Sequence, residues 1–226
     1  MIPLRVIWLD AVDEHGWYEL RDPLARLNLP RPVKFRVRPF SFNEWDQLIE
    51  NMTEWYRPYF QFAVHTGLRP SEQVALKWIA VDTEFIHIEL SRVRNMEKTE
   101  LKTEASRRMI HLRPTLIKIL EQQKAQTKDF NSEYVFLNMD GKVVNQTNLS
   151  SVWRLAMKKS GLTFRRMYET RHTFASWAMS LGENPGWVAR TLGHVDTSMV
   201  YRTYSRYIPN LTKQDGLAFE GRFTGE

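Results

Sequence analysis

Four short stretches of this chain carry side chains that could do chemistry, and two of them lie in its first half. Arg69 follows Gly67 at the expected start of a helix, where the backbone can aim a guanidinium at a fixed anion. Lys102 lies in a polar stretch that leads into an expected strand. Taken singly, an arginine at a helix start is more often a surface residue, and a lysine on such a connection is usually solvated. Neither residue indicates a site by itself.

The other two stretches lie in the second half of the chain. Tyr168 and Arg171 are three residues apart, so a helix would place both on one face. His172 is expected to point elsewhere, as a core or capping histidine. His194 ends a Leu-Gly-His sequence, and Tyr204 follows ten residues later in an expected helix. A helical tyrosine becomes a nucleophile only beside an activated phosphate, so packing alone would also explain it.

In their order along the chain, the four stretches resemble the catalytic signature of tyrosine site-specific DNA recombinases of the phage-integrase type. TGLRPSE resembles the family's first arginine box, and LKTEASRRMIHL resembles its lysine hairpin. YETRHTFAS and LGH, followed by the terminal tyrosine, resemble its second box. The resemblance covers residues 41–208. It implies a recombinase that acts on double-stranded DNA attachment sites, integrates or excises a prophage or another mobile element, and assembles on DNA as a tetramer in its full-length form.

The reaction that this resemblance implies is cleavage and rejoining of a DNA strand through a 3′-phosphotyrosine. Negative charge then concentrates on the non-bridging phosphate oxygens, which Arg69 and Arg171 could clamp. By similarity, Lys102 protonates the departing 5′ oxygen and Tyr204 attacks the phosphorus. His194 adds a hydrogen bond to the phosphate or orients the nucleophile.

No metal ion or other cofactor is expected, because the cationic side chains supply the charge that a metal would otherwise bring. The sequence offers no convincing carboxylate cluster for a metal site. Glu72, which lies beside the first arginine box, is expected to brace Arg69 instead.

Tyr168 stands where the family most often has histidine. Histidine can accept the nucleophile's proton near neutral pH, whereas a tyrosine with an unperturbed pKa near ~10 ordinarily cannot. Tyr168 can still donate a hydrogen bond to the phosphate, so we expect it to be a supporting residue. The identity of the general base stays open, and His194 is a candidate.

The nucleophile must be chosen among three tyrosines. Family members place it nine or ten residues after the histidine of the Leu-Gly-His sequence. The ninth position is Thr203, which cannot serve, and the tenth is Tyr204. Tyr201 and Tyr207 lie at seven and thirteen, so Tyr204 is the expected nucleophile.

The composition agrees with a polyanionic partner and excludes several kinds of chemistry. The chain has 226 residues, a formal net charge of +6 and no cysteine, which excludes disulfides, thiolate metal sites and cysteine nucleophiles. Residues 151–210 hold nine Lys or Arg against three acids, a surplus equal to that of the whole chain. The N-terminus lacks the apolar core of a signal peptide, and no apolar run reaches membrane-spanning length, so we expect a soluble, cytoplasmic protein.

The elements that must position these residues begin after a different N-terminal region. Residues 1–40 hold five of the ten prolines and no sustained hydrophobic periodicity, and LNLPRPVKFRVRPF is typical of an extended basic linker. We expect residues 1–38 to be the end of a core-binding domain plus the interdomain linker. Residues 39–226 are expected to be the catalytic domain with its C-terminal tail. The chain would then be a truncated catalytic fragment that binds DNA weakly.

A mainly α fold with a small antiparallel sheet (α+β) is expected for the second region. Ser41 and Glu44 fit a capping box, and helices are expected at about 57–65, from Pro70, and at 114–127, 147–160, 168–181, 185–192 and 197–207. Alternating apolar residues predict strands at 84–90 and 108–112, and a third is possible at 134–137. Residues 211–226 are either a segment exchanged between protomers or a tail.

Two other functions fit parts of this pattern. Type IB topoisomerases use a similar arginine, lysine, histidine and tyrosine set, but the two arginine boxes are more like those of integrases. A DNA-binding module without chemistry would also be basic, although the set of catalytic positions is complete apart from the tyrosine at 168. A helical interaction protein would leave the ordered motifs unexplained.

Overall fold

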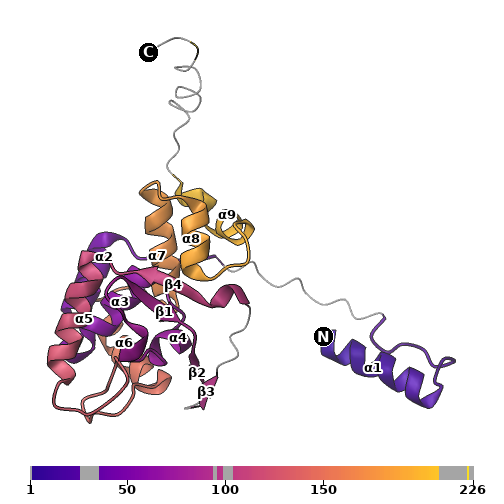
Figure 1. The fold of residues 1–226 in the computed structure, drawn as a ribbon. Coiled ribbons are helices and arrows are strands. Elements are labelled where there is room, and N and C mark those ends of the chain that lie inside the picture. Colours follow the sequence, from indigo (N-terminus) through magenta and orange to yellow (C-terminus); the bar gives the residue numbers. More distant parts are fainter. Residues whose placement is uncertain (1, 26–35, 94–95, 99–103, 209–222, 224–226) are drawn as a thin grey trace. The chain divides into compact units, whose positions relative to one another are not determined.

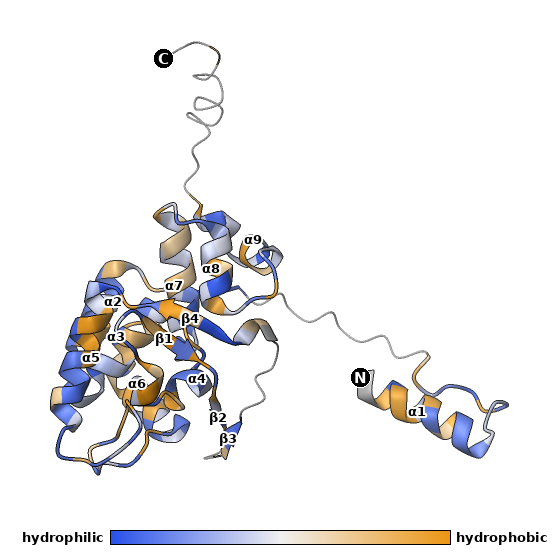
Figure 2. Ribbon diagram, viewed as in Figure 1, coloured by the Kyte–Doolittle hydropathy of each residue, from blue (hydrophilic) through white to orange (hydrophobic). Residues whose placement is uncertain are grey.

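The computed structural model describes residues 2–25, 36–93, 96–98, 104–208 and 223. The chain divides into two compact units, Met1–Arg36 and Val37–Glu226. The first unit contains helix α1 (Ile2–His15), which the sequence pattern did not predict. Apolar and polar residues mix along α1 (Figure 2), and Leu4, Ile7 and Leu9 are exposed on it. A helix without a single apolar stripe has no periodic signal, which is why the pattern missed it.

The second unit opens with three helices that set up the first arginine box (Figure 1). Helix α2 (Phe42–Glu50) starts with the predicted capping box, in which Ser41 Oγ accepts from the backbone N–H of Glu44 over 3.2 Å. Helix α3 (Arg57–Thr66) ends at Gly67, and α4 (Pro70–Val74) begins three residues later. The predicted start and stop signals of these helices are confirmed.

Two small antiparallel pairs of strands follow. Strand β1 (Phe85–Ile88) pairs with β4 (Arg108–His111), and β2 (Ser91–Val93) pairs with β3 (Met96–Lys98). The prediction of a third strand at 134–137 is wrong, because that segment makes only isolated bridges to Lys77 and Val143. Its apolar residues Val135, Phe136 and Leu137 are buried in the core, so burial alone explains the apolar run that resembled a strand.

The remaining helices lie close to their predicted positions. They are α5 (Pro114–Thr127), α6 (Gln146–Lys159), α7 (Glu169–Ser180), α8 (Pro185–Leu192) and α9 (Ser198–Tyr204). Short 3₁₀ turns lie at Glu54–Tyr56, Trp78–Ala80, Glu104–Ser106 and Ser205–Tyr207. The fold is therefore mainly α with small antiparallel sheets, as predicted.

Two hydrophobic clusters hold this second unit together. The larger one joins α2, α3, α5, α6 and the β1–β4 pair, with Phe60 and Trp153 fully buried in it. The smaller one joins α7, α8 and α9 through residues such as Phe174, Leu192 and Tyr204. The three helices of the smaller cluster lie together in Figure 1. None of the helices in the described residues is both long and apolar enough to cross a membrane.

Candidate active site

Arg171 lies at the centre of the residues that the sequence singled out. It is 2 % exposed in the first turn of α7, and its guanidinium donates to Gly67 O over 2.7 Å and to Leu192 O over 2.6 Å. One side chain thus joins the turn after α3 to the end of α8. Burial lowers the pKa of Arg171 to about 10, because the charged form loses water. Its contacts are carbonyl oxygens and a histidine nitrogen, so it keeps positive charge for an anion.

Two glycines allow the backbone to come this close. Gly67 has φ +63°, and a Cβ there would lie 2.5 Å from Phe174 Cδ1. Gly193 has φ +66°, and a Cβ there would lie 3.0 Å from Arg108 Nη1. Both positions are in the left-handed region that favours glycine. The glycines of the two motifs are therefore needed for close approach around the arginines.

Arg69 and Arg108 share one buried carboxylate. Glu72 accepts from Arg69 Nη1 over 2.6 Å and from Arg108 Nη2 over 2.8 Å, and it also accepts from the backbone N–H of Arg69 over 2.9 Å. Burial raises the pKa of Glu72, but Arg108 and Arg69 outweigh it and hold that pKa below its ordinary value. The expectation that Glu72 braces Arg69 is confirmed.

Arg108 was not predicted as part of the site. Its Nε donates to Thr191 O over 2.7 Å, so it also holds the end of α8. Alternation along β4 places Arg108 on the same face as buried Ile110. An arginine on the buried face of a strand was the signal that could have found it, because such a charge needs a partner.

His194 contacts Arg171 directly. Its Nε2 lies 3.2 Å from Arg171 Nη2, and Nδ1 is buried without a hydrogen-bond partner in the described part of the chain. Burial, and then the charges of Arg171 and Arg69, lower the pKa of His194 to about 4. The imidazole is therefore neutral near pH 7, and its Nε2 lone pair accepts the arginine N–H.

Tyr204 is buried, and its hydroxyl meets an unexpected residue. Its Oη lies 2.7 Å from His172 Nδ1, and the side chain is 3 % exposed. The expectation that His172 points away from the site is wrong, because α9 packs against the side of α7 that carries it. Tyr201 is 47 % exposed, and Tyr207 accepts from Arg206 on the 3₁₀ turn after α9.

Of the last two predicted residues, Tyr168 lies within the described residues and Lys102 does not. Tyr168 precedes α7 and is 42 % exposed, with its ring centroid 5.3 Å from that of His172 in an edge-on contact. It therefore lies at the edge of the cluster. Lys102 lies outside the described residues, between β3 and the turn at Glu104–Ser106.

A polar hollow adjoins the arginines. Arg69, Ser71 and Tyr168 line it from one side, and α6 and the loop after it contribute further residues, among them Gln146, Arg154 and Arg166. Three arginines on one hollow favour a polyanion. In the described residues, no group of three or more histidine, aspartate or glutamate side chains could hold a metal ion.

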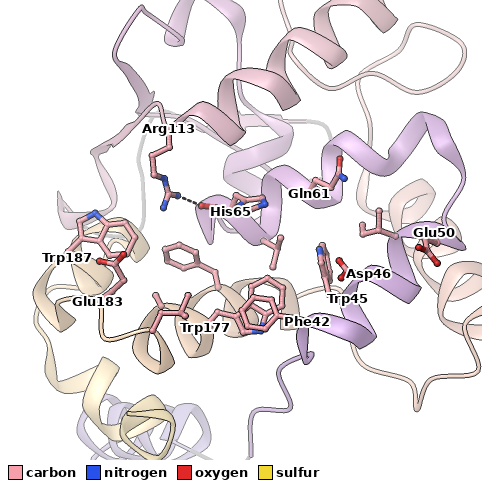
Figure 3. A pocket seen from close by; sticks show the side chains of 15 residues that line it. Phe42, Trp45, Asp46, Glu50, Gln61, His65, Arg113, Trp177, Glu183 and Trp187 are labelled. Carbon is pink, nitrogen blue, oxygen red and sulfur yellow. Dashed lines mark hydrogen bonds between the residues drawn. The ribbon is translucent and has the colours of Figure 1, made fainter. Parts of the chain in front are cut away.

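A second hollow has a different character and contains none of the predicted site residues (Figure 3). It is lined by aromatic side chains from α2, α7 and α8, including Phe42, Trp45, Trp177 and Trp187. Arg113 donates to His65 O at its edge over 2.5 Å. Its lining is mainly aromatic and apolar, and it also holds the carboxylates of Asp46, Glu50 and Glu183, which disfavour a phosphate.

Comparison with known proteins decides the family. The model of the phage integrase family matches residues 39–209, which include all six predicted site residues. The chain belongs to the phage integrase family. A prophage integrase, IntR of Escherichia coli strain K12, is 30 % identical over 208 residues, which are 80 % of this chain and 50 % of that protein. The chain spans about half the length of the first curated relatives it matches.

Solved structures of integrases share the fold. The integrase of transposon Tn1549, in complex with circular intermediate DNA, has a TM-score of 0.75 at 16 % identity, covering 89 % of this chain and 72 % of that one. The lambda integrase, as a tetramer bound to a Holliday junction, has a TM-score of 0.66 at 16 % identity, covering 88 % and 57 %. The expected tyrosine-recombinase catalytic-domain fold is confirmed.

Proposed function

We propose that this chain is the catalytic domain of a site-specific DNA recombinase that cleaves and rejoins strands through a 3′-phosphotyrosine on Tyr204. The observation that carries the proposal is the contact set of Arg171. Its side chain joins the first arginine box, the Leu-Gly-His turn and His194, and the next residue along the helix contacts the Tyr204 hydroxyl. Motifs far apart in the sequence thus meet at one cationic cluster.

Each cluster residue has a role in phosphoryl transfer. Arg69 and Arg171 stabilise the non-bridging oxygens, where charge develops as Tyr204 Oη bonds to phosphorus and the bond to the 5′ oxygen breaks. Arg108 and Glu72 hold Arg69 in place. Lys102 protonates the departing 5′ oxygen, and Tyr168 supports the phosphate. Because these side chains bring the charge, the reaction needs no metal ion.

Similar proteins of known structure support DNA as the partner. The Tn1549 and lambda integrases are bound to DNA in their solved structures, and the lambda enzyme is a tetramer on a Holliday junction. We infer that the full-length protein recognises double-stranded attachment sites and assembles there as a tetramer. The similarity to a prophage integrase favours integration or excision of a mobile element. Residues 1–38 would be the end of a core-binding domain and its linker, in agreement with the division between Arg36 and Val37.

Covalent trapping tests this function. The chain and a Tyr204→Phe variant are incubated with duplexes nicked beside candidate core-site phosphates, and the products are separated on a denaturing gel. A protein–DNA band that is present for the unaltered chain and absent for the variant is the expected result. A band that persists in the variant would move the nucleophile to Tyr201 or Tyr207. No band, with a longer protein on its own attachment site as well, would favour a binding module without chemistry.

A further inference from the structure

The Tyr204 hydroxyl is held by a histidine that none of the expected catalytic roles includes. His172 Nδ1 lies 2.7 Å from Tyr204 Oη, which is the length of a good hydrogen bond. The contact joins α7 to α9 across 32 positions of the sequence. His172 is also the residue after Arg171 on α7. The residue that contacts Tyr204 and the arginine expected to bind the phosphate therefore occupy adjacent positions of one helix.

The buried phenol needs a base when it attacks. Burial raises the pKa of Tyr204, and the charge of nearby Arg171 offsets this only in part. The hydroxyl therefore keeps its proton near neutral pH and must lose it as the bond to phosphorus forms. A group already within hydrogen-bond distance of Oη is the natural acceptor.

Other nearby groups are less suitable acceptors. The Nε2 lone pair of His194 already accepts from Arg171. Tyr168 contacts the ring of His172 edge-on, and no hydrogen bond from it to Tyr204 is found in the described residues. Glu169 and Tyr207 act on Tyr204 only through their charges, at longer range.

His172 has the protonation state that this role requires. Burial, and then the adjacent charge of Arg171, lower the pKa of His172 to about 4, so its ring is neutral near pH 7. A neutral ring with its proton on Nε2 presents the Nδ1 lone pair to the Tyr204 hydroxyl. The titratable and charged groups that face this pair are Tyr168, which precedes α7, Arg171 and Glu169 on α7, and Tyr207 after α9.

We propose that His172 is the general base of strand cleavage, accepting the Tyr204 proton on Nδ1 as Oη bonds to phosphorus. The bond from phosphorus to the 5′ oxygen breaks in the same step, and the 5′ oxygen takes a proton from its own acid. The proton on His172 returns to Tyr204 Oη when the strand is rejoined. This role rests on the proposed function, and it supplies the proton acceptor that Tyr168, standing where the family most often has histidine, does not.

The test measures single-turnover formation of the covalent product by the full chain on nicked duplexes. His172→Asn keeps a polar atom near the Nδ1 position but cannot take up a proton at neutral pH, so the rate is expected to fall about 100-fold or more. His65→Asn is the matched control, since His65 is also a half-buried histidine whose pKa burial lowers, and its rate should stay within about twofold. DNA binding and thermal unfolding are measured for each variant.

A second readout separates proton transfer from a structural role. Replacing Tyr204 by a difluorotyrosine makes the phenol more acidic and lessens the need for a base, so it should restore part of the rate in His172→Asn. The acid limb of the pH–rate profile should also disappear in that variant. Unchanged cleavage by His172→Asn, or a loss that difluorotyrosine does not relieve, would overturn the role of His172. Absence of the covalent band already in the unaltered chain would instead overturn the proposed function and this role together.

Discussion

Helix α7 presents Arg171 and His172 to one side and Phe174 and Trp177 to another, and the two sides are built from different contacts. The first side makes hydrogen bonds to a carbonyl just after α3, to a carbonyl at the end of α8 and to the Tyr204 hydroxyl on α9. The second lines the aromatic hollow shared with α2 and α8 (Figure 3). Directed hydrogen bonds lose their energy with small displacements, whereas apolar contacts depend mainly on buried area. The charged side should therefore be the more sensitive of the two.

The largest effect on stability is expected for Glu72→Gln. It leaves Arg108 and Arg69 without the buried carboxylate that pairs them, so the free energy of unfolding should fall by about 3–5 kcal/mol. Denaturant unfolding measures this. Glu44→Gln is the matched control, because its pair with Arg165 is partly exposed, and that loss should stay within ~1 kcal/mol.

The Glu72 carboxylate also makes the stability of the fold depend on pH. Its folded pKa lies below the ordinary value of 4.5, so its stabilisation is present above pH 4.5 and is lost as the pH falls through the folded pKa. Glu72→Gln should lack this part of the acid-induced loss. Equal stability of the variant and the unaltered chain near neutral pH would show that the two arginines do not depend on Glu72.

The next largest effect is expected for Arg171→Lys, and it should fall mainly on the rate of cleavage. A lysine cannot reach the carbonyls of Gly67 and Leu192 while presenting a planar fork to a phosphate, so cleavage should fall about 100- to 1000-fold. The rate of covalent product formation measures this. Arg57→Lys is the matched control, since Arg57 also donates to two backbone carbonyls, and its rate should change less than about twofold. Normal cleavage by Arg171→Lys would remove Arg171 from the phosphate.

The smallest effect is expected on the apolar side. Phe42 is half exposed and stacks on Trp177 with ring centroids 4.2 Å apart, so Phe42→Ala should lower the free energy of unfolding by only ~0.5–1.5 kcal/mol. Its rate of covalent product formation should equal that of the unaltered chain. A tenfold slower rate in a folded variant would show that the two sides of α7 are coupled.

Much of the secondary structure could be predicted from local pattern. The helix expected at 114–127 has the same bounds in the structure, and the helices expected at 147–160 and 168–181 differ by one residue at each end. Capping residues and glycines determine where a helix starts or ends through contacts within a few positions, so the local sequence predicts these ends. Helix α1 and the segment 134–137 were predicted less well, because one lacks an apolar stripe and the other is buried without a ladder of strand bonds.

The sequence by itself determined the family, the order of the motif residues and the helices that carry most of them. Only the tertiary structure decided that Arg108 meets Glu72 and that His172, expected to point away, meets Tyr204. Spacing along one helix predicts which of its residues share a face, but it does not say which neighbouring element packs on that face. That choice depends on how the hydrophobic clusters of the whole domain orient the helices, and it assigned the Tyr204 hydroxyl to a histidine on α7.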